Sequence, residues 1–143
     1  RTIVRKKNYR IYRNMKITFL EDELSICRMK PDTQVPHWAA DSFFSSVTKT
    51  TDELSIVCES RCIPDSAALE REDGWISIMV EGPLPFSLTG ILASLTVPLA
   101  NADLGVFAIS TFDTDYILIK KKDAEKARNV LSPLFTIIGG ECS

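Results

Sequence analysis

Alternating apolar and polar positions predict short strands along most of this chain. Three of them precede residue 60, and turn-forming or charged residues bound them, as Pro31 and Asp32 do after the first. The stretch from Trp75 to Val80 is almost continuously apolar and β-branched, which is typical of a buried strand. The predicted strands cover residues 24–29, 43–48, 54–58, 75–80, 104–109, 116–119 and 136–138.

Two helices are predicted in the second half of the chain. The first covers residues 88–101, where apolar residues recur at helical spacing, and Ser87 is placed to cap its N-terminus. The second covers residues 121–135, with Asp123 as a cap and one apolar stripe, and Pro133 is placed to shorten it.

An internal repeat relates the two halves at a constant offset of 63 residues. Each half contains a strand, a Thr-Asp hairpin loop and a second strand. The pattern predicts a complete βαββαβ order for the second copy. The first copy has a turn at residues 36–40 and a link at residues 62–73 in place of the two helices. The matching positions are Phe44, Val47, Thr51, Asp52, Leu54 and Ile56 with Phe107, Ser110, Thr114, Asp115, Ile117 and Ile119.

This repeat and the charge distribution suggest a division of the chain. At 143 residues it has room for one ordinary domain or for two very small units that share a core. Residues 1–13 hold six of the 17 Lys and Arg residues and no acid, so the body is acidic and a nucleic-acid platform is not expected. The expected division is a basic arm or leader at 1–14, a first unit at 15–60, a linker at 61–73, a second unit at 74–138 and a tail at 139–143.

Three interpretations of the basic arm at residues 1–14 remain open. It is a solvated tail, a segment that touches RNA or anionic lipid, or an extension that precedes an initiator at Met15.

The amino-acid composition is that of a globular protein. Apolar residues make up 45% and charged residues 25% of the chain, as in globular proteins, and no run of about 18 apolar residues predicts a membrane-spanning helix.

The four cysteines are scattered and only one histidine is present, so neither a metal nor another cofactor is expected. Cys27 and Cys58 lie in apolar runs, which favours reduced thiols and a cytosolic protein. Cys62 beside Arg61 is either an activated thiol or a loop cysteine without a role.

Several motifs now point to a known family. They are EGPLPFSLTGILA at 81–93, PLA at 98–100, ISTFDTDYIL at 109–118, TTDELS at 50–55 and PHW at 36–38. In this order the chain resembles small tandem ACT-domain proteins, over residues 24–138, and the same motifs occur in CASTOR-type arginine sensors. The resemblance implies an α+β fold of two ferredoxin-like ACT units (βαββαβ, the first abbreviated), packed together with antiparallel sheets.

The same resemblance implies a regulatory role rather than catalysis. ACT units bind an amino acid at the interface between two units, and binding changes conformation or association. ACT modules usually regulate an attached enzyme, for which 143 residues leave no room. The chain is therefore expected to be a stand-alone sensor that forms a homodimer or acts on a partner protein.

A free amino acid presents an ammonium and a carboxylate, and the second half offers a partner for each. Asp115 can accept a hydrogen bond from the ammonium, while N–H groups at the start of the predicted helix favour a carboxylate. By the resemblance to the arginine sensors, the loop at residues 82–86 is expected to line the same pocket, with Phe86 and Phe112 covering the ligand's side chain. The candidate ligand-binding residues are Asp52, Glu53, Phe86, Ser87, Leu88, Thr89, Gly90, Ile109, Ser110, Thr111, Thr114 and Asp115.

Other interpretations of these residues remain open. Asp52 and Asp115 can simply cap hairpin turns, and Ser87 can be only a helix cap. Trp38 and Trp75 are core aromatics or lids. The chain can also be an interaction or oligomerisation module that binds no ligand.

An enzyme acting on an amino acid is the least favoured class. It would have to rely on scattered carboxylates such as Glu53, Glu81 and Asp115, since the chain lacks GxSxG, GxxxxGK and HExxH motifs. Its single imidazole, His37, lies in a turn without a nucleophile motif to pair with.

Overall fold

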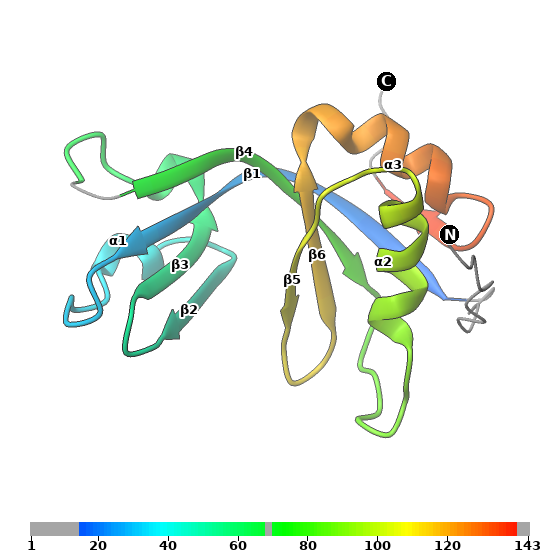
Figure 1. The fold of residues 1–143 in the computed structure, drawn as a ribbon, viewed down its shortest axis with the longest axis horizontal. Helices are drawn as coiled ribbons and strands as arrows, with labels where there is room; N and C mark the ends of the chain where they lie inside the picture. The colour runs from blue at the N-terminus through cyan, green and yellow to red at the C-terminus, as the bar shows by residue number, and fades with distance from the viewer. Residues whose placement is uncertain (1–14, 68–69, 140–143) are drawn as a thin grey trace, which may run out of the picture.

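Two long strands hold the molecule together in the computed structural model, which describes residues 15–67 and 70–139 (Figure 1). β1 (Lys16–Met29) and β4 (Glu70–Val80) pair antiparallel along most of their length. The other elements are α1 (His37–Ala40), β2 (Ser45–Lys49), β3 (Leu54–Glu59), the 3-10 turn η1 (Ser60–Cys62), α2 (Ile91–Asn101), β5 (Phe107–Ser110), β6 (Asp115–Lys120), the 3-10 turn η2 (Lys121–Asp123), α3 (Ala124–Leu131) and β7 (Thr136–Ile138).

The strands form one continuous sheet of seven strands in the order β2-β3-β1-β4-β6-β5, with β7 parallel to β1. Strands β4-β1-β3-β2 form the first unit, and this is the ferredoxin-like strand order. The second unit uses the other halves of β1 and β4 together with β5, β6 and β7. The expected α+β fold with a ferredoxin-like antiparallel sheet is therefore confirmed. The two expected units share β1 and β4 instead of packing as separate sheets.

The shared strands β1 and β4 bend at the boundary between the two units. The register of β1 against β4 shifts between Leu20 and Leu24 and again before Ile26. Opposite this bend, Gly74 has a φ of +79°, a backbone conformation that favours glycine. The bend separates the lobe of β2 and β3 from the lobe of β5, β6 and the two longer helices (Figure 1).

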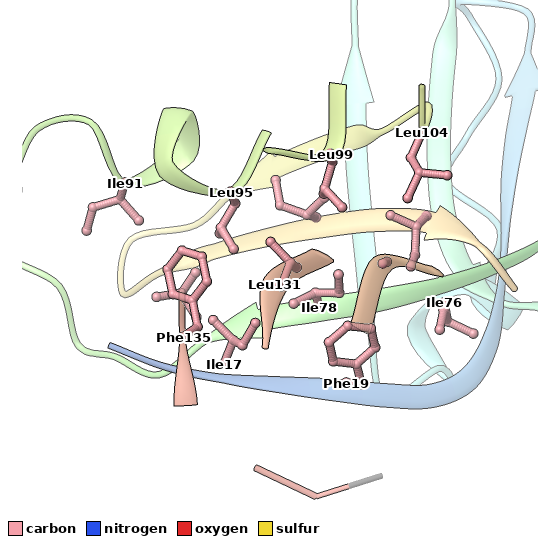
Figure 2. Packing of buried hydrophobic residues seen from close by; sticks show 14 residues of the cluster. Ile17, Phe19, Ile76, Ile78, Ile91, Leu95, Leu99, Leu104, Leu131 and Phe135 are labelled. Carbon is pink, nitrogen blue, oxygen red and sulfur yellow. The ribbon is translucent and has the colours of Figure 1, made fainter. Parts of the chain in front are cut away.

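Apolar side chains gather in three clusters. The largest lies between the sheet and helices α2 and α3, where Ile78, Leu95 and Leu131 are fully buried (Figure 2). A smaller one in the first unit includes Cys27, Cys58 and the partly buried Trp38. The third lies on the opposite face of the sheet, at the seam between the units; its members are Leu24, Ile26, Phe44, Val57, Trp75, Phe107, Ile109, Tyr116 and Leu118. Trp38 and Trp75 are therefore packing residues.

Several element boundaries differ from those expected, and β5 begins at Phe107 rather than at residue 104. β1 is 14 residues long because the strand continues through the exposed acids Glu21 to Glu23, which interrupt the apolar alternation. β4 begins at Glu70, so residues 70–73 of the expected linker are strand. α3 ends at Leu131, before Pro133, and residues 121–123 ahead of it form a 3-10 turn.

The start of α2 also differs from the expectation. The helix begins at Ile91 with Gly90 as its N-cap at a φ of 80°, so the prediction that Ser87 caps it is wrong. The reason is a separate turn ahead of the helix, in which the Leu88 N–H donates to the carbonyl of Pro85 (3.0 Å).

The hairpin register corrects the repeat offset. Lys49 pairs with Leu54 at the end of the first hairpin, and Ser110 pairs with Asp115 at the end of the second. Equivalent positions are therefore 61 residues apart, not 63. Asp52 corresponds to Asp113 rather than to Asp115.

Candidate functional site

A cavity of about 330 Å³ lies at one end of the second unit. Its walls are the loop between β4 and α2, the first turn of α2, and the turn that joins β5 to β6. These segments lie at the same end of that unit (Figure 1). We call this the hairpin cavity; its lining residues are Leu84, Pro85, Phe86, Leu88, Gly90, Ile91, Leu92, Ala93, Ser110, Thr111, Phe112, Asp113, Thr114 and Asp115.

The loop before α2 is fixed against the hairpin by backbone contacts. The Leu84 N–H donates to the Asp113 carbonyl (2.8 Å), and the Thr114 hydroxyl donates to the carbonyl of Val80 (2.6 Å). Gly82 fits here because it lacks a side chain: a Cβ at this position would lie 2.9 Å from the Asp113 carbonyl oxygen. These contacts give the cavity a defined shape.

The first turn of α2 supplies hydrogen-bond donors to the cavity. The first intrahelical bond runs from the Ser94 N–H to the Gly90 carbonyl (2.9 Å). The N–H groups of Ile91, Leu92 and Ala93 precede that bond, so they have no carbonyl partner within the helix. All three residues line the cavity, and the helix dipole adds partial positive charge there.

The hairpin supplies the acceptors. Asp115 is half-buried, and one of its carboxylate oxygens accepts a hydrogen bond from the Ser110 hydroxyl (2.6 Å). The turn is closed by Thr111, whose N–H donates to the Thr114 carbonyl (2.8 Å). A second carboxylate, that of the exposed Asp113, also lines the cavity.

Two exposed aromatic rings meet at this cavity. Phe86 comes from the loop before α2 and Phe112 from the hairpin, and their ring centroids are 4.9 Å apart in an edge-to-face arrangement. The side chains are 76% and 79% exposed, which is unusual for phenylalanine and leaves an apolar surface next to the cavity.

Seven of the twelve candidate residues line this cavity: Phe86, Leu88, Gly90, Ser110, Thr111, Thr114 and Asp115. Ser87 and Thr89 are exposed in the same loop but do not line it. Ile109 instead lines a small cavity between β5 and the β2–β3 hairpin. Asp52 and Glu53 lie in the hairpin of the first unit, where their N–H groups donate to the Thr50 hydroxyl (3.2 and 3.1 Å).

Some residues of this site were not among the candidates. Asp113 is not a candidate because the repeat offset aligns Asp52 with Asp115. The residue type of Ser87 predicts the helix-start donors at residues 87–90, whereas the structure places them at Ile91, Leu92 and Ala93. Gly90, with its positive φ, is the residue before the helix, and glycine is one of the residues accepted at an N-cap.

The equivalent place in the first unit is different. There, Pro31 and Asp32 of the loop after β1 face Lys49 to Thr51 of the hairpin across a shallow depression. The helix that follows, α1, has only four residues and contributes no comparable turn of N–H donors. Of these two equivalent places, the one in the second unit combines the start of a longer helix with an acidic hairpin.

Other polar features lie outside the hairpin cavity. Cys27, Cys58 and Cys62 are free thiols, and burial raises the pKa of Cys58 to about 12. Within residues 15–67 and 70–139, no three His, Cys, Asp or Glu side chains gather as a metal site. Nor does any helix in these ranges have the length and apolar character needed to cross a bilayer.

Comparison with known sequences gives two family matches. The family model of the ACT domain matches residues 70–133, and the model of an N-terminal domain matches residues 22–66. The human protein CASTOR3P is 31% identical over 106 residues, which are 66% of this chain and 65% of that protein. The bovine cytosolic arginine sensor for mTORC1 subunit 1 is 28% identical over 110 residues, 68% of this chain and 33% of the sensor. The chain thus spans less than two thirds of either relative.

Solved structures extend the likeness to nearly the whole chain. The crystal structure of an Agobacterium tumefaciens protein is 33% identical with a TM-score of 0.81, covering 90% of this chain and 96% of that one. The regulatory subunit of aspartate kinase from Thermus thermophilus has a TM-score of 0.57 at 9% identity, covering 88% and 97%; this likeness shows the fold alone. The motifs, the fold and these matches agree that residues 70–133 are an ACT domain.

Proposed function

We propose that this chain is a regulator that binds a free amino acid in the hairpin cavity. The observation that carries the proposal is that the Asp115 carboxylate and the unpaired N–H groups at the start of α2 line one cavity. A zwitterion needs both an acceptor for its ammonium and donors for its carboxylate.

Each end of the ligand has a partner of the right chemistry. The ammonium donates charge-assisted hydrogen bonds to Asp115, with the hydroxyls of Ser110, Thr111 and Thr114 nearby. The carboxylate accepts from the N–H groups of Ile91, Leu92 and Ala93, where the helix dipole adds to the attraction. The volume of about 330 Å³ lies at the lower end of the range for small-molecule sites, which suits an amino acid.

The ligand's side chain extends toward the apolar part of the cavity. Leu84, Leu88 and the ring pair of Phe86 and Phe112 form that part. Because the two rings come from the loop and from the hairpin, a ligand between these segments changes how the rings are presented.

The signal is read through association. The exposed ring pair is a surface for a second copy of the chain or for a regulated partner protein, which would complete the site as an interface between ACT units. The name of the bovine relative describes a cytosolic sensor, and we place this protein in the cytosol as well.

Thermal unfolding with a panel of amino acids tests the proposal. A ligand at 100 times its Kd stabilises the folded state by about 2.7 kcal/mol, which raises the melting temperature measurably. Asp115→Asn should remove this response because the ammonium loses its charged partner. The matched control is Asp52→Asn, in the hairpin of the first unit and outside the cavity, which should keep the response in full.

The exposed ring pair also favours a second candidate, an interaction module that binds no small ligand. A dimeric native mass together with no melting response at millimolar amino acid would support that module and refute the sensor. Monitoring product in the same samples separates binding from catalysis, because a stabilised protein without turnover is a binding protein.

A further inference from the structure

A second cavity lies at the seam between the two units, on the face of the sheet opposite the helices. It has a volume of about 150 Å³ and lies where β1 and β4 pass from one lobe to the other (Figure 1). We call it the seam cavity. Residues from both units line it, including Asp22 and Leu24 of β1, Glu59 of β3, Ser77 of β4 and Tyr116 of β6.

Ser77 points a polar group into this space. It is 2% exposed, and its hydroxyl forms no hydrogen bond within residues 15–67 and 70–139. Its neighbours Ile76 and Ile78 face the helices, so strand alternation directs Ser77 to the opposite face. The space from which this hydroxyl can take a hydrogen-bond partner is the seam cavity that it lines. A ligand in the seam cavity would satisfy this group.

Glu59 forms a wall of the cavity, and its own bonds are complete. Its carboxylate accepts hydrogen bonds from the Phe43 N–H (2.6 Å), the Arg61 Nε (2.7 Å) and the Ser42 hydroxyl (3.3 Å). Arg61 therefore neutralises Glu59, and Glu59 orients Phe43. The charge that remains for a ligand must come from another residue.

Asp22 provides that charge. It is exposed at the bend of β1 between two further acids, Glu21 and Glu23. No hydrogen bond or ion pair joins its carboxylate to another side chain in the described part of the chain. Arg61 is bound to Glu59 and also attracts Asp22 electrostatically. The four carboxylates of Glu21, Asp22, Glu23 and Glu59 against this one guanidinium leave the place negative, which favours a cation over an anion.

Aromatic rings complete the lining. Phe44 and Tyr116 are in edge-to-face contact with ring centroids 4.9 Å apart, and both line the cavity beside the exposed Phe43. Aromatic faces next to a carboxylate are the combination that attracts organic cations, since the ring quadrupole adds to the ionic attraction.

We propose that the seam cavity binds a small organic cation, an ammonium or a guanidinium group. Asp22 accepts its charged hydrogen bond, the Ser77 hydroxyl accepts a second one, and the rings of Phe44 and Tyr116 pack against its carbon atoms. The volume of about 150 Å³ lies below the range of about 300–1,000 Å³ of drug-sized ligand sites, so the group that binds is small. This site is separate from the hairpin cavity and does not depend on the function proposed for it.

Butylammonium is a suitable probe, and 1-butanol is its neutral counterpart with the same number of heavy atoms. Titrated into the ¹⁵N-labelled full chain, butylammonium should shift the backbone amide signals of Leu24, Ser77 and Tyr116 saturably, whereas butanol should not. Asp22→Asn should weaken binding at least tenfold. The control Glu23→Gln removes a neighbouring charge that does not line the cavity and should weaken it less than threefold.

Three results would overturn the proposal. One is equal shifts with butanol, which would show simple filling of an apolar space. Another is an equal loss in Glu23→Gln and Asp22→Asn, which would show only a diffuse charge effect. The third is shifts confined to Ser110 and Asp115, which would place the cation in the hairpin cavity. Asp115→Asn should bind butylammonium as the unaltered chain does, so the two sites are tested independently.

Discussion

Replacing Gly82 with alanine places a methyl group in the wall of the hairpin cavity. The new Cβ would lie 2.9 Å from the Asp113 carbonyl oxygen, closer than Cβ atoms come to other atoms, and 3.1 Å from the Thr114 Cβ, which is a tight contact. Because the nearest atom is backbone, the loop has to move away from the hairpin. That movement breaks the hydrogen bond of 2.8 Å from the Leu84 N–H to the Asp113 carbonyl.

The cost follows from these two effects. Overpacking costs about 1–3 kcal/mol and a lost backbone hydrogen bond about 1 kcal/mol, so Gly82→Ala should lower the free energy of unfolding by about 2–4 kcal/mol. Urea denaturation measures this as a lower midpoint at an unchanged slope. The variant should also lose its melting response to amino acids, since the loop no longer shapes the cavity.

Gly105→Ala is the matched control. A Cβ there would meet no atom within 4 Å, so the substitution should be neutral or stabilising by up to about 1 kcal/mol. Equal midpoints for the two variants would refute the close approach of loop and hairpin on which the site depends.

Three further predictions concern the stability of the fold. Leu95→Ala, in the fully buried centre of the helical core, should cost about 3–5 kcal/mol in urea denaturation, and the half-buried Leu92→Ala distinctly less; equal costs would contradict the core assignment. Burial alone would raise the pKa of Glu59, but hydrogen bonds from Arg61 and Phe43 hold that pKa below its usual value. The Glu59 carboxylate therefore stabilises the fold above pH about 4.3, and this stabilisation is lost as the pH falls through the pKa of the folded state. The urea midpoints of the unaltered chain and Glu59→Gln should therefore converge in acid, and a constant gap from pH 7 to pH 3 would refute this role. Removing residues 1–14 should leave melting and ligand response unchanged, because β1 begins at Lys16 and already pairs with β4 and β7; a shortened chain that fails to fold would contradict it.

Local patterns in the sequence were enough to predict the hairpins and most of the acidic site. The loops after Lys49 and Ser110 are each closed by a threonine hydroxyl, and such turns depend on neighbouring residues alone. The position of Asp115 at the start of a strand was predictable for the same reason. Its place in a cavity with α2 depends on contacts across the fold.

What the sequence did not reveal depends on distant contacts. The first half of β1 is a strand because β4 and β7 pair on either side of it, although acids interrupt its apolar pattern. The fit of Gly82 against Asp113 joins segments about 30 residues apart in sequence and leaves no local pattern. The shared strands likewise became visible only in the sheet topology.

The most direct measurement of the central claim is the backbone amide spectrum of the ¹⁵N-labelled chain during titration with an amino acid that raises its melting temperature. If the ligand's carboxylate sits at the start of α2 and its ammonium at Asp115, the amide signals of Ile91, Leu92, Ala93 and Asp115 should move most, and the corresponding amine without a carboxylate should leave the three helix signals in place. Shifts centred on the seam or on the hairpin of the first unit, with these four signals unmoved, would contradict the account.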